Sequence, residues 1–322
     1  MFLNFKRFLV AVIFSLLPAH FTAAEAWDKV AARSLSHYIM GVLYEDLEDF
    51  DQAIQEYQKA IQSETQNTEL RLKLASSYIK KNEIEAAIKE LKLVIALDPT
   101  IVQPHVLLSL LYSVQKQEGP ALVEYEAALK NASVLQPENT DLYKGLGAVY
   151  VRQNKLIQAK GVYKLLIGLN PKDPEAYFYS GSVNYELKDL PAAEKDLKAA
   201  LRLKPDYHEA LNFLGYAYLE EGKNIAAAGK LIKKALELDP DNPAYMDSLG
   251  WFYFKKGRFK EAQEELERAS LLLEDPVIFD HLGDLYLKTG DTLKARLNWE
   301  HALALDPSQV MIKSKLEKLN GK

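Results

Sequence analysis

The sequence predicts an all-α protein built from a row of similar helical hairpins. Three observations support this fold class. A pattern of apolar and small residues recurs roughly every 34 residues along nearly the whole chain, each copy divides into two stretches of helical periodicity, and a short turn separates them. Because one hairpin cannot bury its apolar stripe alone, neighbouring hairpins must stack on one another.

The copy between Asp241 and Ala269 shows the pattern most clearly. Two amphipathic helices are predicted there, with Gly257 in the turn between them. The pattern positions are Leu249, Gly250, Tyr253, Gly257, Phe259, Ala262, Leu266 and Ala269. By residue type and spacing, this copy resembles the tetratricopeptide repeat. The resemblance implies an α-solenoid, a right-handed superhelix of about eight helix-turn-helix units that ends in a C-terminal capping helix.

Matching copies divide residues 34–309 into an array. They are predicted at residues 34–67, 68–101, 102–139, 140–173, 174–207, 208–242, 243–275 and 276–309. Pro99 and Pro240 each follow an Asp at the end of a copy, where proline stops the helix and disfavours the α conformation of the residue before it. Residues 310–322 are predicted to form a lysine-containing capping helix and tail that solvate the end of the array.

Two copies depart from the regular length. In the third copy Pro137 arrives four residues late, which is about one helical turn, so the second helix of that copy is predicted to be longer. In the sixth copy one extra residue lies between Gly222 and Ala228, and we expect the turn to absorb it.

Residues 1–26 do not fit the repeat and are predicted to be a signal peptide. Lys6 and Arg7 precede the apolar run 8–17, and Ala24 to Ala26 form a small-x-small cleavage site. An uncleaved membrane anchor is the alternative, but ten residues of helix rise only about 15 Å, half the hydrocarbon thickness. We expect cleavage after Ala26 and a periplasmic protein, with secretion or anchoring by an uncleaved signal as the alternatives.

The composition excludes covalent links through cysteine and argues against binding of nucleic acid. The chain has no cysteine, so it can form neither a disulfide nor a lipid-modified cysteine after the signal peptide. With a net charge of −5 and a pI near 5.8, it offers no basic stripe for DNA or RNA, and no nucleic-acid partner is expected.

The candidate site is a second stripe on the first helix of each copy. Positions 2, 5, 9 and 12 face away from the core stripe and would ordinarily be polar, yet many of them are apolar or aromatic. The family resemblance implies that this stripe lines a concave groove that binds extended peptides or partner helices. The candidate partner-binding residues are Tyr38, Val42, Leu72, Val106, Leu110, Phe178, Tyr185, Asn212, Tyr216, Leu219, Asp247, Trp251 and Phe254.

Two alternatives remain open for this stripe. Its rings could instead pack against the adjacent copy and belong to the core. Its polar residues Glu175, Glu209, Asn212, Asp247, Asp280 and Asp284 could form an acidic rim that favours basic or neutral partners, or simply a solvated face.

No catalytic, cofactor-binding or metal-binding residue is predicted. The histidines are scattered without a second ligand at i+4, and neither a glycine-rich phosphate loop nor a nucleophile motif occurs. Two specialised versions of the repeat are also not matched. Lys144 is followed by Ala148 and not by the asparagine of a carboxylate clamp, and Asn212 alone does not make the asparagine ladder of glycosyltransferase repeats.

Residues 212–307 resemble more narrowly the C-terminal repeats of a bacterial envelope group, through the segment NFLGYAYLEEGKNIAAAGKLIKKALELDPDNPAYMDSLGWFYFKKGRFKEAQEELERA. One type in that group is an outer-membrane lipoprotein that serves as adaptor for a carboxyl-terminal processing protease. This chain lacks the lipidation cysteine and has fewer repeats. We therefore expect a non-enzymatic periplasmic scaffold that binds a peptide or helix of a protein partner, such as an envelope protease or export complex. The alternative is a structural or self-associating component of such an assembly, and the oligomeric state is left open.

Overall fold

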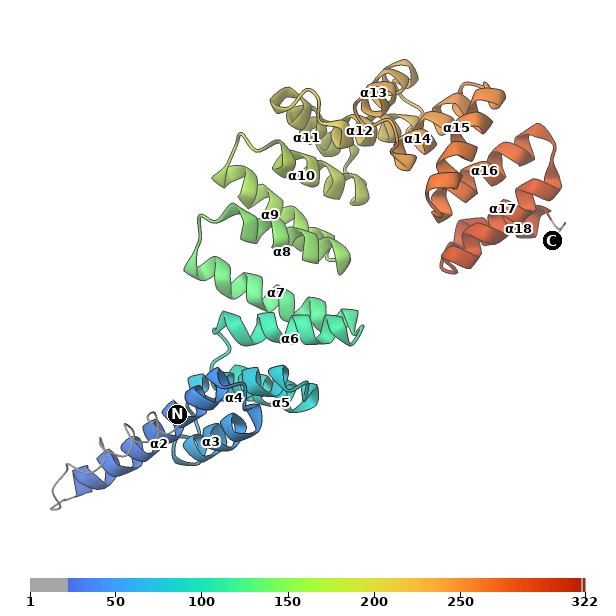
Figure 1. Cartoon of the computed structure of the whole chain (residues 1–322). Helices are drawn as coiled ribbons and strands as arrows, with labels where there is room; N and C mark the ends of the chain where they lie inside the picture. Colours follow the sequence, from blue (N-terminus) through green and yellow to red (C-terminus); the bar gives the residue numbers. More distant parts are fainter. Residues whose placement is uncertain (1–22, 320, 322) are drawn as a thin grey trace. The chain divides into compact units, whose positions relative to one another are not determined.

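The structure is a computed structural model that describes residues 23–319 and residue 321, with side chains from residue 29. This part of the chain forms 17 α-helices, α2 to α18, and contains no strand (Figure 1). Most of the predicted signal peptide, residues 1–22, lies outside the described residues, and its last four residues begin helix α2. No described helix combines the length and the apolar content needed to cross a bilayer.

The chain divides into two compact units, residues 1–136 and 137–322, which are described separately. The first unit contains α2 (Ala23–Asp46), α3 (Phe50–Ser63), α4 (Thr68–Lys80), α5 (Ile84–Leu97), α6 (Val102–Val114) and α7 (Glu118–Leu135). The second contains α8 (Thr140–Arg152), α9 (Leu156–Leu169), α10 (Pro174–Glu186), α11 (Leu190–Leu203), α12 (His208–Glu220), α13 (Ile225–Leu238), α14 (Pro243–Lys255), α15 (Phe259–Leu272), α16 (Pro276–Thr289), α17 (Thr292–Leu305) and α18 (Val310–Leu319).

Consecutive helices pack in pairs, from α2 with α3 to α16 with α17, and α18 packs against α17. Figure 1 shows the two helices of each pair side by side, joined by a tight turn. The all-α prediction of stacked hairpins with a final capping helix is confirmed.

The same position of every second helix carries a small residue that is almost completely buried. These residues are Ala53, Ala87, Ala121, Ala159, Ala193, Ala228, Ala262 and Ala295. A small side chain there lets the two helices approach closely, and the larger apolar residues above and below fill the space between hairpins. The close packing of the hairpins therefore depends on a small residue at this recurring position.

Glycines in the first helices mark the closest crossings. A Cβ built on Gly147 would lie 2.5 Å from the Tyr163 ring of the partner helix, and one built on Gly250 would lie 2.6 Å from Leu266 Cγ. Ala75 replaces this glycine in the second hairpin, where the buried side chain in the same cluster is the smaller Leu91. Because Gly250 also faces a leucine, the residue opposite does not by itself decide between glycine and alanine at this position.

The turns follow the sequence predictions. Gly257 has a φ of 71°, which a residue without Cβ adopts at low cost. The extra residue of the sixth hairpin lies in the turn, where Gly222 and Asn224 have φ of 64° and 48°. In the third hairpin α7 has 18 residues, four more than α5 or α9, which confirms the predicted longer helix.

Helix α18 covers the end of the second unit. Ile312 is 2% exposed in the same core cluster as Trp299, and Leu316 and Leu319 pack against that cluster. On its outer side, Met311 is open to solvent. The helix therefore acts as the predicted cap, with an apolar side toward the last hairpin and a solvated side away from it.

We predict that Gly147→Ala lowers the stability of the second unit by about 1 to 3 kcal/mol, because the added methyl group overpacks the contact with Tyr163. The matched control is Gly161→Ala on α9, where a Cβ would meet nothing within 4 Å. That variant should stabilise the helix by about 0.5 to 1 kcal/mol. Urea unfolding followed by circular dichroism measures both changes, and equal midpoints for the two variants would contradict the proposed role of the crossing.

Candidate functional site

The candidate partner-binding residues differ widely in exposure. Those exposed to solvent are Val106 and Leu110. Those half-buried are Tyr38, Val42, Phe178, Tyr185, Asn212, Tyr216 and Phe254, and those buried are Leu72, Leu219, Asp247 and Trp251. They belong to α2, α4 and α6 in the first unit and to α10, α12 and α14 in the second, so each unit carries its own part of the stripe.

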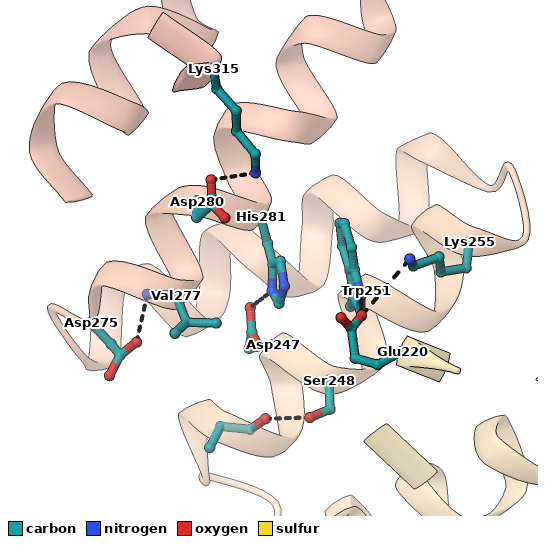
Figure 2. Close-up of polar contacts among 11 residues, drawn as sticks. Glu220, Asp247, Ser248, Trp251, Lys255, Asp275, Val277, Asp280, His281 and Lys315 are labelled. Carbon is teal, nitrogen blue, oxygen red and sulfur yellow. Dashed lines mark hydrogen bonds and ion pairs between the residues drawn. The ribbon is translucent and has the colours of Figure 1, made fainter. Parts of the chain in front are cut away.

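Trp251 is the main correction to the sequence prediction. Its ring is only 6% exposed, because it stacks on the His281 ring at 4.0 Å between centroids and on Phe254 at 4.7 Å. Its Nε1 donates a hydrogen bond to Glu220 Oε1 at 2.7 Å. Figure 2 shows the indole lying alongside the imidazole of His281. The alternative that rings of this stripe pack within the chain therefore holds for Trp251, since side chains of α12, α14 and α16 enclose the ring.

Asp247 is also buried and does not form an exposed acidic rim. Its Oδ1 lies 2.8 Å from Nδ1 of His281, and both side chains are about 5% exposed. The two residues are 34 positions apart, which places them on adjacent first helices, α14 and α16. The sequence analysis looked for a partner of each histidine only four residues further along the same helix, which does not reveal this pair. A comparison of residues one repeat apart would have revealed it.

The environment of His281 favours its charged form. Complete burial by itself lowers the pKa of the imidazole, but the negative charge and the hydrogen bond of Asp247 raise it, with further contributions from Asp280 and Asp284. The outcome is a pKa above the ordinary value near 6.5. A protonated His281 stacked on Trp251 also gains from the interaction of a cation with an aromatic face.

The capping helix partly neutralises the acidic residues of α16. Lys315 Nζ lies 2.6 Å from an oxygen of Asp280 (Figure 2). It also lies 2.8 Å from an oxygen of Asp284. Burial raises the pKa of Asp284, and the bond to Lys315 opposes that rise. These two carboxylates are therefore already paired within the chain.

Lys144 is likewise paired. Its Nζ lies 2.9 Å from Asp173 and 2.7 Å from Glu175, so the ammonium group is held by two carboxylates of the next hairpin. This arrangement leaves the lysine poorly placed to receive a terminal carboxylate, as the missing asparagine at Ala148 led us to expect.

Two hollows lie on this unit, and each is lined by a residue that contacts the stacked pair: Asp247, which pairs with His281, and Phe254, which stacks on Trp251. The first, which we call the acidic pocket, has a volume of about 300 Å³ and includes Asn212, Tyr216, Asp247, Asp275, Leu273 and Val277 in its lining. The second, the distal pocket, has a volume of about 340 Å³ and is lined by Phe254, Asp284, Leu287 and Lys288. Three of the predicted residues, Asn212, Tyr216 and Asp247, are brought together at the acidic pocket, and Asp275, Leu273 and Val277 were not predicted.

Both pockets combine apolar and polar lining residues. Among residues 29–319, no group of three or more His, Asp or Glu side chains is placed to hold a metal ion. The half-buried rings of Tyr216 and Phe254 and the apolar walls of the two pockets offer surface that a second molecule could bury.

We predict that the second unit becomes less stable as the pH rises, because His281 then loses the proton that stabilises the folded chain. Because the pKa of His281 is higher in the folded chain than in the unfolded chain, protonation stabilises the fold fully below about pH 6.5, and this contribution disappears as the pH rises through the raised pKa. His281→Gln and Asp247→Asn should both lose this pH dependence. Urea unfolding below pH 6.5 and again in mildly alkaline buffer measures it, and an unchanged pH profile in both variants would refute the role of the pair.

Comparisons with known proteins agree with the fold. Two models described as tetratricopeptide repeat match, one at residues 46–107 and 221–278 and the other at residues 145–207 and 189–243. Their matches together span residues 46–107 and 145–278, which is more than half of the chain.

Two curated relatives match over part of their length. The human protein O-mannosyl-transferase TMTC1 is 27% identical over 191 residues, which cover 57% of this chain and 21% of the relative. The bovine BBSome complex member BBS4 is 24% identical over 183 residues, which cover 57% of this chain and 34% of the relative. This chain therefore spans between a fifth and about a third of these relatives.

Solved structures are similar in fold. A tetratricopeptide repeat protein from Parabacteroides merdae gives a TM-score of 0.61 at 20% identity, covering 79% of this chain and 99% of that one. The Cut9–Hcn1 hetero-tetramer of the APC/C gives 0.58 at 17% identity, covering 84% of this chain and 52% of that one. With hairpins, crossings and family models in agreement, the chain belongs to the tetratricopeptide repeat family.

Proposed function

We propose that this protein is a non-enzymatic scaffold or adaptor of the periplasm that binds a segment of a partner protein on the second unit. A tetratricopeptide repeat fold suggests a scaffold for protein–protein interactions. The observation that carries the more specific proposal is the pair of pockets on α14 and α16, bordered by the half-buried rings of Tyr216 and Phe254.

The arrangement of the pockets suits an extended segment. Val277 lines the acidic pocket and Leu287 lines the distal pocket, ten residues further along α16. At 1.5 Å per residue these positions are about 15 Å apart, a distance that four or five extended residues span. A partner segment lying along α14 and α16 could therefore place one side chain in each pocket.

Recognition on this surface must depend on side chains. The backbone donors and acceptors of α14 and α16 are used within the helices, so the partner cannot add a strand as it would at a sheet edge. Phe254, which lines the distal pocket, is held by its stack on Trp251, whose Nε1 donates a hydrogen bond to Glu220. A surface fixed in this way loses little conformational entropy on binding, which favours affinity.

The remaining parts of the proposal rest on the sequence and the relatives. The periplasmic location rests on the N-terminal basic, apolar and small-residue segments of residues 1–26. The bovine relative is named as a member of a complex, which agrees with a scaffold role. The human relative is named as a mannosyl-transferase, but this chain spans only 21% of it, and we do not assign that activity to this chain.

We predict that replacing the half-buried rings weakens partner binding. Tyr216→Leu together with Phe254→Leu keeps apolar bulk but removes both rings, and loss of such anchors should cost about 2 kcal/mol or more of binding free energy, at least a tenfold loss of affinity. The matched control is Val134→Ala on α7 of the first unit, which shortens an apolar side chain that is 79% exposed and lines neither pocket.

The measurement is crosslinking in cells, followed by mass spectrometry of the partners captured by each variant. Circular dichroism should first show that each variant is folded. If the folded double variant captured the same partners in the same amounts as the parent chain, binding on this surface would be excluded.

We also predict that the protein accumulates in the periplasm with Trp27 as its first residue, because Ala24 to Ala26 match a signal-peptidase site. Osmotic-shock fractionation and mass spectrometry of the N-terminal peptide measure this. A variant lacking residues 2–26 is the control and should remain in the cytoplasm. Recovery of the intact N-terminus from the membrane fraction would instead indicate an uncleaved anchor.

A further inference from the structure

The acidic pocket has a defined chemical character. Its lining includes two carboxylates, Asp247 and Asp275, and no lysine, arginine or histidine among the described residues. The Oδ1 atom of Asn212 is buried at the same place and has no hydrogen-bond partner. Leu273 and Val277 contribute apolar walls. A group that fits here must carry both an apolar stem and a positively charged donor.

The carboxylates of the pocket are only partly used within the chain. Asp275 caps α16 by accepting a hydrogen bond from the Val277 backbone N–H on Oδ1 at 2.8 Å, which leaves Oδ2 for another donor (Figure 2). Asp247 uses Oδ1 with His281. The nearby Asp280 and Asp284 share Lys315, and Asp247 is paired with His281, so of these four carboxylates only Asp275, at the acidic pocket, has no cationic side-chain partner.

The pKa of Tyr216, which lines the same pocket, also indicates a negative potential there. Burial raises the pKa of the Tyr216 hydroxyl, and the charges of Glu220 and Asp247 raise it further. The phenol therefore stays neutral and keeps its proton, and an anionic ligand would meet unfavourable electrostatics here. An apolar pocket with this field suits the methylene stem and cationic head of lysine or arginine.

We propose that the acidic pocket binds a lysine or arginine side chain of the partner segment. The aliphatic stem of that side chain packs on Leu273 and Val277, and its cationic head pairs with Asp275 in a pocket that Asp247 and Asn212 also line. This assignment rests on the proposed function, since it names the chemistry of the segment that the surface binds. It also gives the segment a register, with the basic residue four or five positions away from the residue in the distal pocket.

Selection from a random library tests the specificity. Peptides of about 12 residues, which can span both pockets when extended, are displayed on phage and selected on the immobilised full chain. The expected result is a consensus with lysine or arginine at one fixed position. A synthetic, fluorescein-labelled consensus peptide should bind at least tenfold more weakly when that residue is replaced by alanine, as anisotropy titration measures.

Substitutions in the protein test the pocket itself. Asp275→Asn removes one charge but keeps a good helix cap, and it should weaken the consensus peptide about fivefold. The matched control is Asp291→Asn, which changes the equivalent cap of α17, where Asp291 accepts from Lys294 N outside the pocket, and it should leave affinity unchanged.

A second pair of variants replaces Val277 by longer side chains that occupy the pocket themselves. Val277 is 43% exposed on the first turn of α16, so long side chains fit there without a change in the core. Val277→Lys should place its own ammonium group at the pocket and reduce binding of the consensus peptide about tenfold or more. Val277→Met has a similar length without the charge, and we expect at most a twofold change from it.

The possible outcomes are distinct. Selected peptides without a basic consensus, or a consensus peptide unaffected by Asp275→Asn and Val277→Lys, would overturn the assignment of the pocket while leaving peptide binding intact. Failure to select any binding peptide on the folded chain would count against both the proposed function and this inference. Equal effects of Asp275→Asn and Asp291→Asn would attribute the loss to helix capping and would also overturn the assignment.

Discussion

The structure depends on the close crossing of two helices within each hairpin. A glycine or alanine in the first helix faces a large buried side chain of the second, as Gly147 faces Tyr163 and Gly250 faces Leu266. This approach makes each hairpin thin enough to stack on the next with its apolar residues covered from both sides. Because each hairpin contacts mainly its neighbours, a change in one crossing acts first on the packing of the adjacent hairpins.

Stacking also determines which residues meet on the candidate surface. First helices of adjacent hairpins lie side by side, so side chains roughly one repeat apart in the sequence come into contact. Asp247 and His281, which share a hydrogen bond, are 34 residues apart, and Glu220 and Trp251, which share another, are 31 residues apart. These lateral contacts hold in place Asp247, which lines the acidic pocket, and Trp251, on which Phe254 of the distal pocket stacks.

The charges of the second unit are divided by the same contacts. Lys315 from the capping helix forms ion pairs with both Asp280 and Asp284, and His281 pairs with Asp247. Asp275 has only a backbone partner. A row of acidic residues in the sequence therefore becomes one paired region and one region with unused acceptors, and only the second can offer a partner something that the chain does not already satisfy.

The sequence by itself determined the hairpins, their turns, the longer α7 and the capping helix, because each follows from local spacing of apolar residues, glycines and prolines. It also located Asn212, Tyr216 and Phe254 on the partly exposed stripe, since helical periodicity decides which face a residue occupies. Only the tertiary structure decided that Trp251 and Asp247 are enclosed and that Asp275 and Val277 line a pocket. Periodicity describes one helix at a time, whereas burial and charge pairing depend on how closely the next helix approaches and which side chains it brings.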